Sequence, residues 1–146
     1  MKVDFYQLSR DPVEKVVAGI ARKVRADDGR LLVVSSDEAQ RKTISKELWT
    51  AYPQEFLANG PVGAVGAERQ PILISDQATP ENDAKIAILA DGEWREEAAA
   101  LDRCLLMFGE AQTQDARTLW RGFDAREDVE RRIFKQTPDG RWQEGG

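Results

Sequence analysis

The chain has 146 residues, enough for one domain with a substantial hydrophobic core. Its formal net charge is −5, which disfavours non-specific nucleic-acid binding, because such binding needs a basic field to displace counterions. The chain contains no histidine, so a Ser-His-Asp triad in its usual form and a His-ligated zinc site are excluded.

The N-terminal residues show no signal-peptide pattern and lead directly into an alternating stretch at residues 3–8, which predicts a strand. No apolar run approaches the ~20 residues of a membrane span, so we expect a cytoplasmic protein. Asp11, Pro12 and Glu14 predict a helix start, with Asp11 as N-cap and Glu14 completing a capping box. Apolar residues at helical spacing continue this helix to Val24.

An almost entirely apolar stretch at residues 30–34 predicts a strand that is covered on both faces. Ser35, with Glu38 three residues later, is expected to cap a second helix that carries Ile44 and Leu48. This β-α-β-α opening predicts a parallel sheet with helices packed on it, so the expected fold class is α/β.

Apolar runs and turn residues continue to alternate beyond the second helix, without an internal repeat, and we treat residues 1–146 as one domain. In chain order we expect a loop at 52–70, strands at 71–75 and 84–89, a helix at 94–101, a strand at 103–108, a helix at 113–123, a strand at 129–135, a turn at 137–140, Trp142 packed back on the body, and fraying at Gly145 and Gly146.

The strand-to-helix turns lack the features of a nucleotide-binding loop. The turn after the first strand contains no glycine, and Asp37 and Glu38 stand where a phosphate would sit after the second. Gly60, Gly63 and Gly66 do not lie between a strand and a capped helix, and we expect them to form a flexible loop. We therefore expect no bound cofactor.

Groups suited to catalysis are also scarce. Cys104 lies in an apolar strand, which is the setting of a buried and inert thiol. Asp27, Asp28, Asp91 and Glu93 lie in turns, where acidic residues are far commoner than catalytic dyads. We expect no catalytic and no metal-binding residues. A small α/β enzyme that uses Asp or Lys chemistry is the alternative.

On the helix expected at 113–123, Arg117, Trp120 and Arg121 share one face. Two interpretations are open at this point. The helix is either a solvated one whose tryptophan packs at the rim of the core, or part of a socket for an anionic, partly apolar partner. In the socket, the arginines would offer forked donors and the indole would offer stacking area.

Large aromatic side chains also occur outside the expected core positions. Trp49 ends the second helix, and Tyr52 and Phe56 lie in the loop that follows. They either pack against the core and hold this loop in place, or they form a protein-binding patch.

Several motifs occur in order over nearly the whole chain: Asp4-Phe5-Tyr6-Gln7-Leu8, Leu48-Trp49 seven residues before Phe56, the glycine-rich loop, Pro71-Ile72-Leu73-Ile74, the strand from Arg103 to Phe108, Ala116-Arg117-x-x-Trp120-Arg121, and Gly140-Arg141-Trp142. Together they resemble the chi subunit of bacterial DNA polymerase III. This resemblance implies a three-layer Rossmann-like domain with a mostly parallel sheet, helices on both faces and no nucleotide-binding loop.

The resemblance also implies a function. The chi subunit is a non-catalytic part of the clamp-loader assembly, and it binds the acidic, Phe-terminated C-terminal tail of single-stranded-DNA-binding protein. By this resemblance Arg117, Trp120 and Arg121 form the tail pocket, with Phe56 at its edge and Phe108 from the preceding strand.

A second surface is implied for the psi subunit or a helicase-like partner. It maps onto Leu48, Trp49 and Pro53. Contact with DNA would then be only indirect.

Two departures from the family pattern bear on tail binding. Ala58 and Asn59 replace a Pro-His pair, and Asp124, Glu127 and Asp128 place acid beside the expected pocket. We expect weaker or more salt-sensitive tail binding.

Direct binding of single-stranded nucleic acid is a further alternative. It would use Arg117, Arg121, Arg131, Arg132 and Trp120, and it would weaken steeply with salt.

Overall fold

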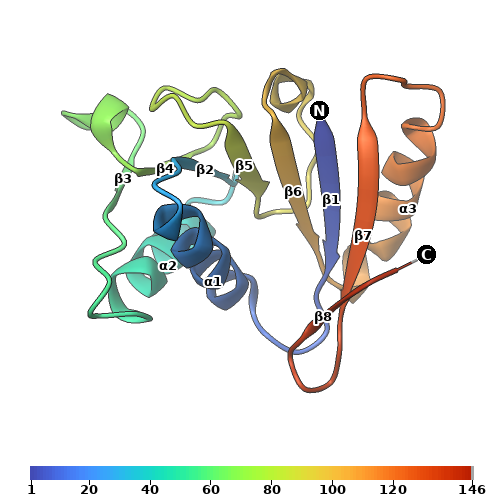
Figure 1. Cartoon of the computed structure of the whole chain (residues 1–146), viewed down its shortest axis with the longest axis horizontal. Helices are drawn as coiled ribbons and strands as arrows, with labels where there is room; N and C mark the ends of the chain where they lie inside the picture. Colours follow the sequence, from blue (N-terminus) through green and yellow to red (C-terminus); the bar gives the residue numbers. More distant parts are fainter. Residues whose placement is uncertain (146) are drawn as a thin grey trace.

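The computed structural model describes residues 1–145, whose strands form one eight-stranded sheet (Figure 1). The strand order is β3-β4-β2-β5-β6-β1-β7-β8, and every pairing is parallel except β7 with β8. The strands are β1 Lys2–Gln7, β2 Leu31–Val34, β3 Asn59–Pro61, β4 Ile72–Ser75, β5 Ile86–Leu89, β6 Arg103–Phe108, β7 Glu130–Gln136 and β8 Trp142–Glu144; the helices are α1 Val13–Ala26, α2 Glu38–Thr50 and α3 Thr113–Gly122; the short 3-10 helices are η1 Ala67–Arg69, η2 Glu96–Ala100 and η3 Glu110–Gln112.

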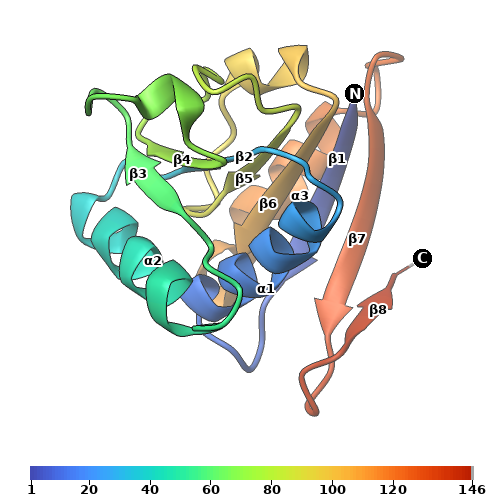
Figure 2. The same cartoon turned by 60° about the vertical axis from the view of Figure 1, so that its left-hand side comes forward.

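The sheet lies between two helical layers, so the expected α/β class is confirmed. Helices α1 and α2 cover one face, and α3 and η2 cover the other (Figure 2). Strand β2 has all four residues buried, as its apolar sequence predicts for a strand covered on both faces. The predicted helix at 94–101 is only the 3-10 helix η2.

The loop between β1 and α1 is held by one buried side chain from β7. Gln136 Oε1 accepts hydrogen bonds from the backbone N–H groups of Ser9, Arg10 and Asp11 at 3.3, 3.0 and 3.1 Å. Gln136 Nε2 donates to Asp11 Oδ2 at 2.9 Å. The Asp11 carboxylate is therefore directed to β7 and not to the helix, and the predicted Asp11 N-cap with its capping box is wrong.

The two N-terminal helices begin differently from the sequence prediction. Pro12 occupies the N-cap position of α1, which has no side-chain cap. The cap of α2 is Asp37, which accepts hydrogen bonds from the N–H groups of Ala39 and Gln40. Ser35 is buried two residues earlier, and its hydroxyl accepts from the Asp37 N–H at 3.1 Å. The predicted Ser35 cap is thus displaced by a competing acceptor two residues later.

The glycine-rich stretch predicted as a flexible loop contains two ordered elements, β3 and η1. Gly60 lies in β3, where an added Cβ would come within 2.7 Å of Gln70 Nε2. Gly63 and Gly66 have φ angles of +85° and +80°, which glycine adopts without steric cost. These glycines permit a tight path along the sheet edge.

The C-terminal segment completes the sheet at the other end. Trp142 packs edge-on against Tyr6, with ring centroids 4.9 Å apart, so its predicted return to the body is confirmed. The Gly145 N–H donates to the Ile133 carbonyl at 2.8 Å, so the fraying predicted there is wrong. Gly146 lies outside the described residues.

A buried carboxylate fixes the register of the three strands beneath α3. Asp4 in β1 is fully buried and accepts hydrogen bonds from Arg103 in β6 and Arg132 in β7. Its neighbour Phe5 therefore points to the opposite face, toward α3.

Candidate functional site

A cavity of about 280 Å³ lies between α3 and the strands β1, β6 and β7. Of these elements, α3 and β7 lie at the right-hand end of the molecule in Figure 1. The walls of the cavity combine aromatic, aliphatic and basic side chains from all four elements. The lining residues are Phe5, Gln7, Phe108, Thr113, Ala116, Arg117, Trp120, Ile133 and Lys135.

The aromatic part of this cavity is fixed by packing. Trp120 meets Phe5 edge-on with ring centroids 5.1 Å apart, and Phe5 meets Phe108 at 6.5 Å. The Arg131 guanidinium lies 4.7 Å from the centre of the indole and donates to the Trp120 carbonyl. The indole is therefore held before any ligand arrives, which lowers the entropic cost of binding.

The charged part of the cavity is basic. Arg117 and Lys135 line it, and no acidic side chain does. Arg121 follows on the exposed side of α3 and does not line the cavity. Within residues 1–145, Arg117, Arg121 and Lys135 form no ion pair with a carboxylate, whereas Arg131 pairs with Asp124. The unpaired cations leave an anion-attracting surface on an acidic protein.

Two of the three acidic residues beside α3, Asp124 and Asp128, are paired with neighbouring arginines. Asp128 pairs with Arg126 at 2.8 Å, and Arg126 also pairs with Glu96 at 2.7 Å. The hydrogen bond from Arg126 lowers the pKa of the Asp128 carboxyl. Because Asp124 and Asp128 both have a cationic partner, they repel an approaching anion less than their number in the sequence implies.

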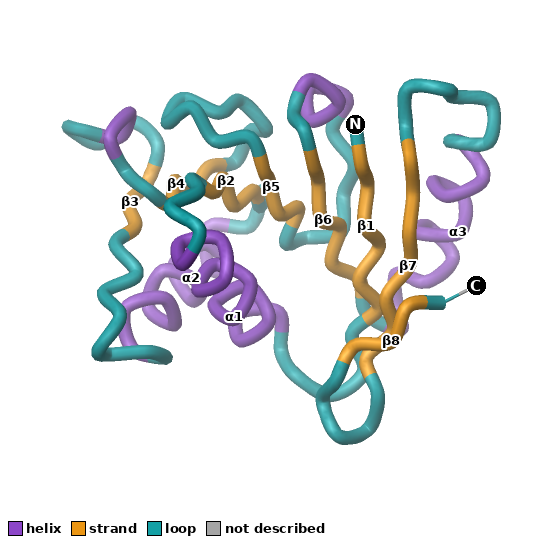
Figure 3. The backbone as a smooth tube through the Cα atoms, in the orientation of Figure 1, coloured by secondary structure: helices purple, strands orange, loops and turns teal. Residues whose placement is uncertain are grey.

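Phe56 lies elsewhere in the molecule. It belongs to the connection between α2 and β3, which lies at the opposite end of the sheet from β7 (Figure 3). It does not line the cavity. Its side chain is 80% exposed, and its φ angle is +47°, a left-handed conformation that a bulky residue rarely adopts. The structure thus brings Arg117, Trp120 and Phe108 together but leaves Phe56 apart.

The residues assigned to a second partner differ in exposure. Leu48 is 1% exposed and packs between α2 and the sheet, so it supports the surface from below. Trp49 is 51% exposed, and Pro53 is exposed in the turn that follows. Trp49, in the last turn of α2, and the exposed Pro53 and Phe56 of the following connection are together called the Trp49 patch (Trp49, Pro53 and Phe56).

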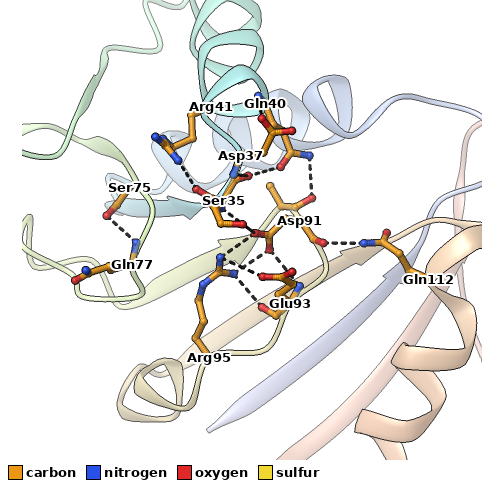
Figure 4. A network of polar contacts seen from close by, with 12 residues as sticks. Ser35, Asp37, Gln40, Arg41, Ser75, Gln77, Asp91, Glu93, Arg95 and Gln112 are labelled. Atoms are coloured by element: carbon orange, nitrogen blue, oxygen red, sulfur yellow. Dashed lines mark hydrogen bonds and ion pairs between the residues drawn. The ribbon is translucent and has the colours of Figure 1, made fainter.

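The segments that follow β2 and β5, at the edge where sheets of this type often bind ligands, are joined by a polar network (Figure 4). Asp91 accepts hydrogen bonds from both terminal nitrogens of Arg95, at 2.9 and 2.8 Å, and from the Ser36 N–H at 2.9 Å. Burial acts to raise the pKa of the Asp91 carboxyl, but the hydrogen bonds from Arg95, Ser36 and Glu93 outweigh it and lower the pKa. Asp91 is therefore a charged structural acceptor.

The variant Asp91→Asn is expected to lose about 1–3 kcal/mol of unfolding free energy at pH 7. The folded pKa of Asp91 lies below its ordinary value, so its stabilisation is complete above that value and disappears as the pH falls through the folded pKa. Urea unfolding of both proteins should give a difference that narrows toward pH 3. The exposed Asp76→Asn serves as the control, and a pH-independent difference would contradict this assignment.

The single cysteine is buried in β6, as predicted. Burial raises the pKa of the Cys104 thiol to about 12, so the reactive thiolate is suppressed. Within the part of the chain that the structure describes, no group of three or more Cys, Asp or Glu side chains is arranged to hold a metal ion.

Comparison with protein families identifies the chain. The family model described as DNA polymerase III chi subunit, HolC, matches residues 1–128 of the 146. The chain belongs to the DNA polymerase III chi subunit family. The chi family is an accessory subunit of the DNA polymerase III complex, which places the chain in DNA replication. A comparison with curated proteins found no match.

None of the helices in residues 1–145 combines the length and the apolar composition that are needed to cross a bilayer.

Two of the arginines that direct nucleic-acid binding would use are already bound to other groups of the protein. Arg131 is bound to Asp124 and to the Trp120 carbonyl, and Arg132 is bound to Asp4.

Six lining residues of the cavity were not assigned to it from the sequence: Phe5, Gln7, Thr113, Ala116, Ile133 and Lys135. The alternation within β7 carries a signal, because Ile133 and Lys135 are two apart and so lie on one face. Which face that is depends on the pairing of β7 with β1, which local sequence does not reveal.

Proposed function

We propose that the cavity beneath α3 binds the acidic, Phe-terminated C-terminal tail of single-stranded-DNA-binding protein. The observation that carries this proposal is the combination of a fixed aromatic floor with unpaired cations and no lining acid. A peptide that ends in an apolar side chain and carries acidic residues matches both features. The chain acts as a non-catalytic, cytoplasmic subunit. The suppressed thiol of Cys104 and the occupied carboxylate of Asp91 support the non-catalytic role.

Tail binding is tested by fluorescence-anisotropy titration of a labelled tail peptide at low and moderate salt. Arg117→Ala should weaken binding by about 1–3 kcal/mol, because it removes a charged donor from the cavity wall. A peptide without its terminal Phe should bind more weakly still. Arg117 is the sharper target, since Trp120 also packs on Phe5 and its removal disturbs the core.

The matched control is Arg69→Ala, an exposed arginine in η1 near the opposite end of the sheet. It alters the net charge equally and should leave the affinity nearly unchanged. Equal losses of tail-peptide affinity in the two variants would mean that only the overall charge matters. Full affinity in both variants would show that Arg117 is not part of the binding site.

We further propose that the Trp49 patch docks a psi subunit or a helicase-like partner and thereby joins the chain to the clamp loader. Trp49 at the end of α2 and Phe56 in the connection that follows are both exposed, and exposed aromatic side chains are typical anchors of protein interfaces. Phe56 belongs to this surface on the grounds of its position and exposure.

Trp49→Ala should weaken capture of the chain by the clamp-loader assembly at least tenfold while leaving tail-peptide affinity within twofold. The two surfaces lie at opposite ends of the sheet, so a change in one should not reach the other. Pull-down with purified clamp loader and the same anisotropy titration provide both readouts. Loss of tail binding in a folded Trp49→Ala protein would refute the separation of the two surfaces.

A further inference from the structure

The connection between α2 and β3, which carries two residues of the Trp49 patch, is fixed to the body of the protein at the end that enters β3. Leu57 is 3% exposed and packs in the core with α2. Asn59, the first residue of β3, accepts a hydrogen bond from the Ser45 hydroxyl at 2.6 Å. Residues 51–56 form neither helix nor strand, so their course depends on contacts made by their side chains.

One arginine of α1 makes such contacts. Helices α1 and α2 lie side by side on one face of the sheet (Figure 2). Arg22 Nε lies 2.8 Å from both carboxylate oxygens of Glu55, and a terminal nitrogen of Arg22 lies 2.8 Å from Glu55 Oε1. The same guanidinium lies 4.7 Å from the centre of the Tyr52 ring, and the Tyr52 hydroxyl lies over Gly19, where an added Cβ would be 3.7 Å away. Arg22 therefore holds two residues of the connection at once.

The contact between Arg22 and Glu55 is exposed, which limits what it adds to stability. The Arg22 side chain is 51% exposed, and the Glu55 side chain is 38% exposed. Ion pairs at such positions add little to the free energy of folding, because water screens the charges. A forked donor still fixes the direction of the carboxylate that it binds. The pair therefore orders the connection more than it stabilises the domain.

Phe56 is the residue whose position depends on this order. Its backbone is in the left-handed region, which a bulky residue adopts only where the surrounding structure holds it there. The neighbours on both sides are held, Glu55 by Arg22 and Leu57 by the core. With both neighbours fixed, the Phe56 ring is directed to solvent. If Glu55 is released, the Phe56 backbone can relax to an ordinary conformation, and the ring then moves.

We propose that Arg22 is a positioning residue for the docking of the psi subunit or a helicase-like partner. It acts through Glu55 and Tyr52, by holding Phe56 in its outward conformation. Arg22 itself lies on α1, outside the Trp49 patch. This assignment rests on the docking function proposed above, and it predicts that a change on a different helix weakens docking while every residue of the patch is retained.

Titration of the full chain against the purified clamp-loader assembly tests this role. Arg22→Ala should weaken binding about fivefold, because the connection must then be ordered on binding. Glu55→Ala should have the same effect, and the double variant should bind no more weakly than either single variant, because both substitutions break one contact. Arg22→Lys keeps the charge without the fork and should restore only part of the loss.

Two further measurements separate positioning from stability. Hydrogen exchange of the amides of residues 54–58 should become faster in Arg22→Ala, whereas its urea midpoint and its tail-peptide affinity should stay unchanged. Lys23→Ala is the matched control, since it removes the same charge from the exposed lysine that follows Arg22 on α1. It should change neither docking nor exchange.

Additive losses from Arg22→Ala and Glu55→Ala would mean that each residue contacts the partner by itself, and a lower urea midpoint that accounts for the loss would mean a purely structural role. Either result would overturn the assignment. Unchanged docking of Arg22→Ala, with the loss still seen in Trp49→Ala, would overturn the role of Arg22 and leave the docking surface intact. Unchanged docking of Trp49→Ala would instead overturn the proposed docking function, and with it this assignment.

Discussion

Val33→Asp is expected to leave the chain unfolded at every temperature at which the unmodified protein is native. Val33 is the third residue of β2, is fully buried, and is paired with Ile74 on β4 and Ile88 on β5. Both strand edges and both faces are covered, so an introduced carboxylate finds neither water nor a cation. Burying an unpaired charge costs more than the ~5–15 kcal/mol that stabilises a typical domain, so unfolding or protonation must follow.

The matched control is Val65→Asp, the same substitution at a valine that is 100% exposed. It should change the unfolding free energy by less than ~0.5 kcal/mol. Val33→Ala should remain folded with a loss of about 2–3 kcal/mol, which separates loss of packing from burial of charge. Circular dichroism and thermal melting measure all three variants, and a cooperatively folded Val33→Asp protein at pH 7 would refute the observed sheet.

Gln136→Ala is expected to lower the unfolding free energy by about 2–4 kcal/mol. Within residues 1–145 the substitution removes the one side-chain acceptor of the N–H groups of Ser9, Arg10 and Asp11, and it also removes the donor to the Asp11 carboxylate. Backbone groups that are left unpaired near the interior cost about 1–3 kcal/mol each, and partial hydration of the loop limits the total.

Urea unfolding measures this loss, and Gln143→Ala, an exposed glutamine in β8, should change stability by less than ~0.5 kcal/mol. The affinity for the tail peptide should also fall, because the Gln136 side chain anchors the loop that follows Gln7, a lining residue of the cavity. If the Gln136→Ala protein is as stable as the Gln143→Ala protein, water replaces the hydrogen bonds of the Gln136 side chain without loss of stability, and this prediction is wrong.

The positions of six of the eight strands followed closely from the sequence, whereas β3, β8 and the helix caps did not. An apolar run such as 31–34 has one stable place in a soluble protein, between two covering layers, whatever the rest of the chain does. A cap depends on which of several nearby acceptors is free. Asp11 satisfies the local rule for a cap, but Gln136, 125 residues away, binds its carboxylate instead.

The candidate site likewise combines features that local sequence predicts with features that only the tertiary structure shows. The helical spacing of Arg117 and Trp120 is a local property, and the structure brings both to one cavity. Phe56 was assigned to that cavity by resemblance, and the structure instead places it beside the opposite edge of the sheet. Lys135 had no local signal of function, because an alternating β7 does not disclose which of its faces meets α3.

The sequence by itself determined the α/β class, the buried strands, the absence of a nucleotide loop and a basic, aromatic helix, because each depends on residue type and on spacing within one element. Only the tertiary structure decided what surrounds that helix. The parallel pairing of β7 with β1 sets Lys135 beside Gln7 and opposite Arg117, and the strand order separates Phe56 from Trp120. Pairing between strands more than a hundred residues apart is selected by the packing of the whole sheet, and no local pattern encodes it.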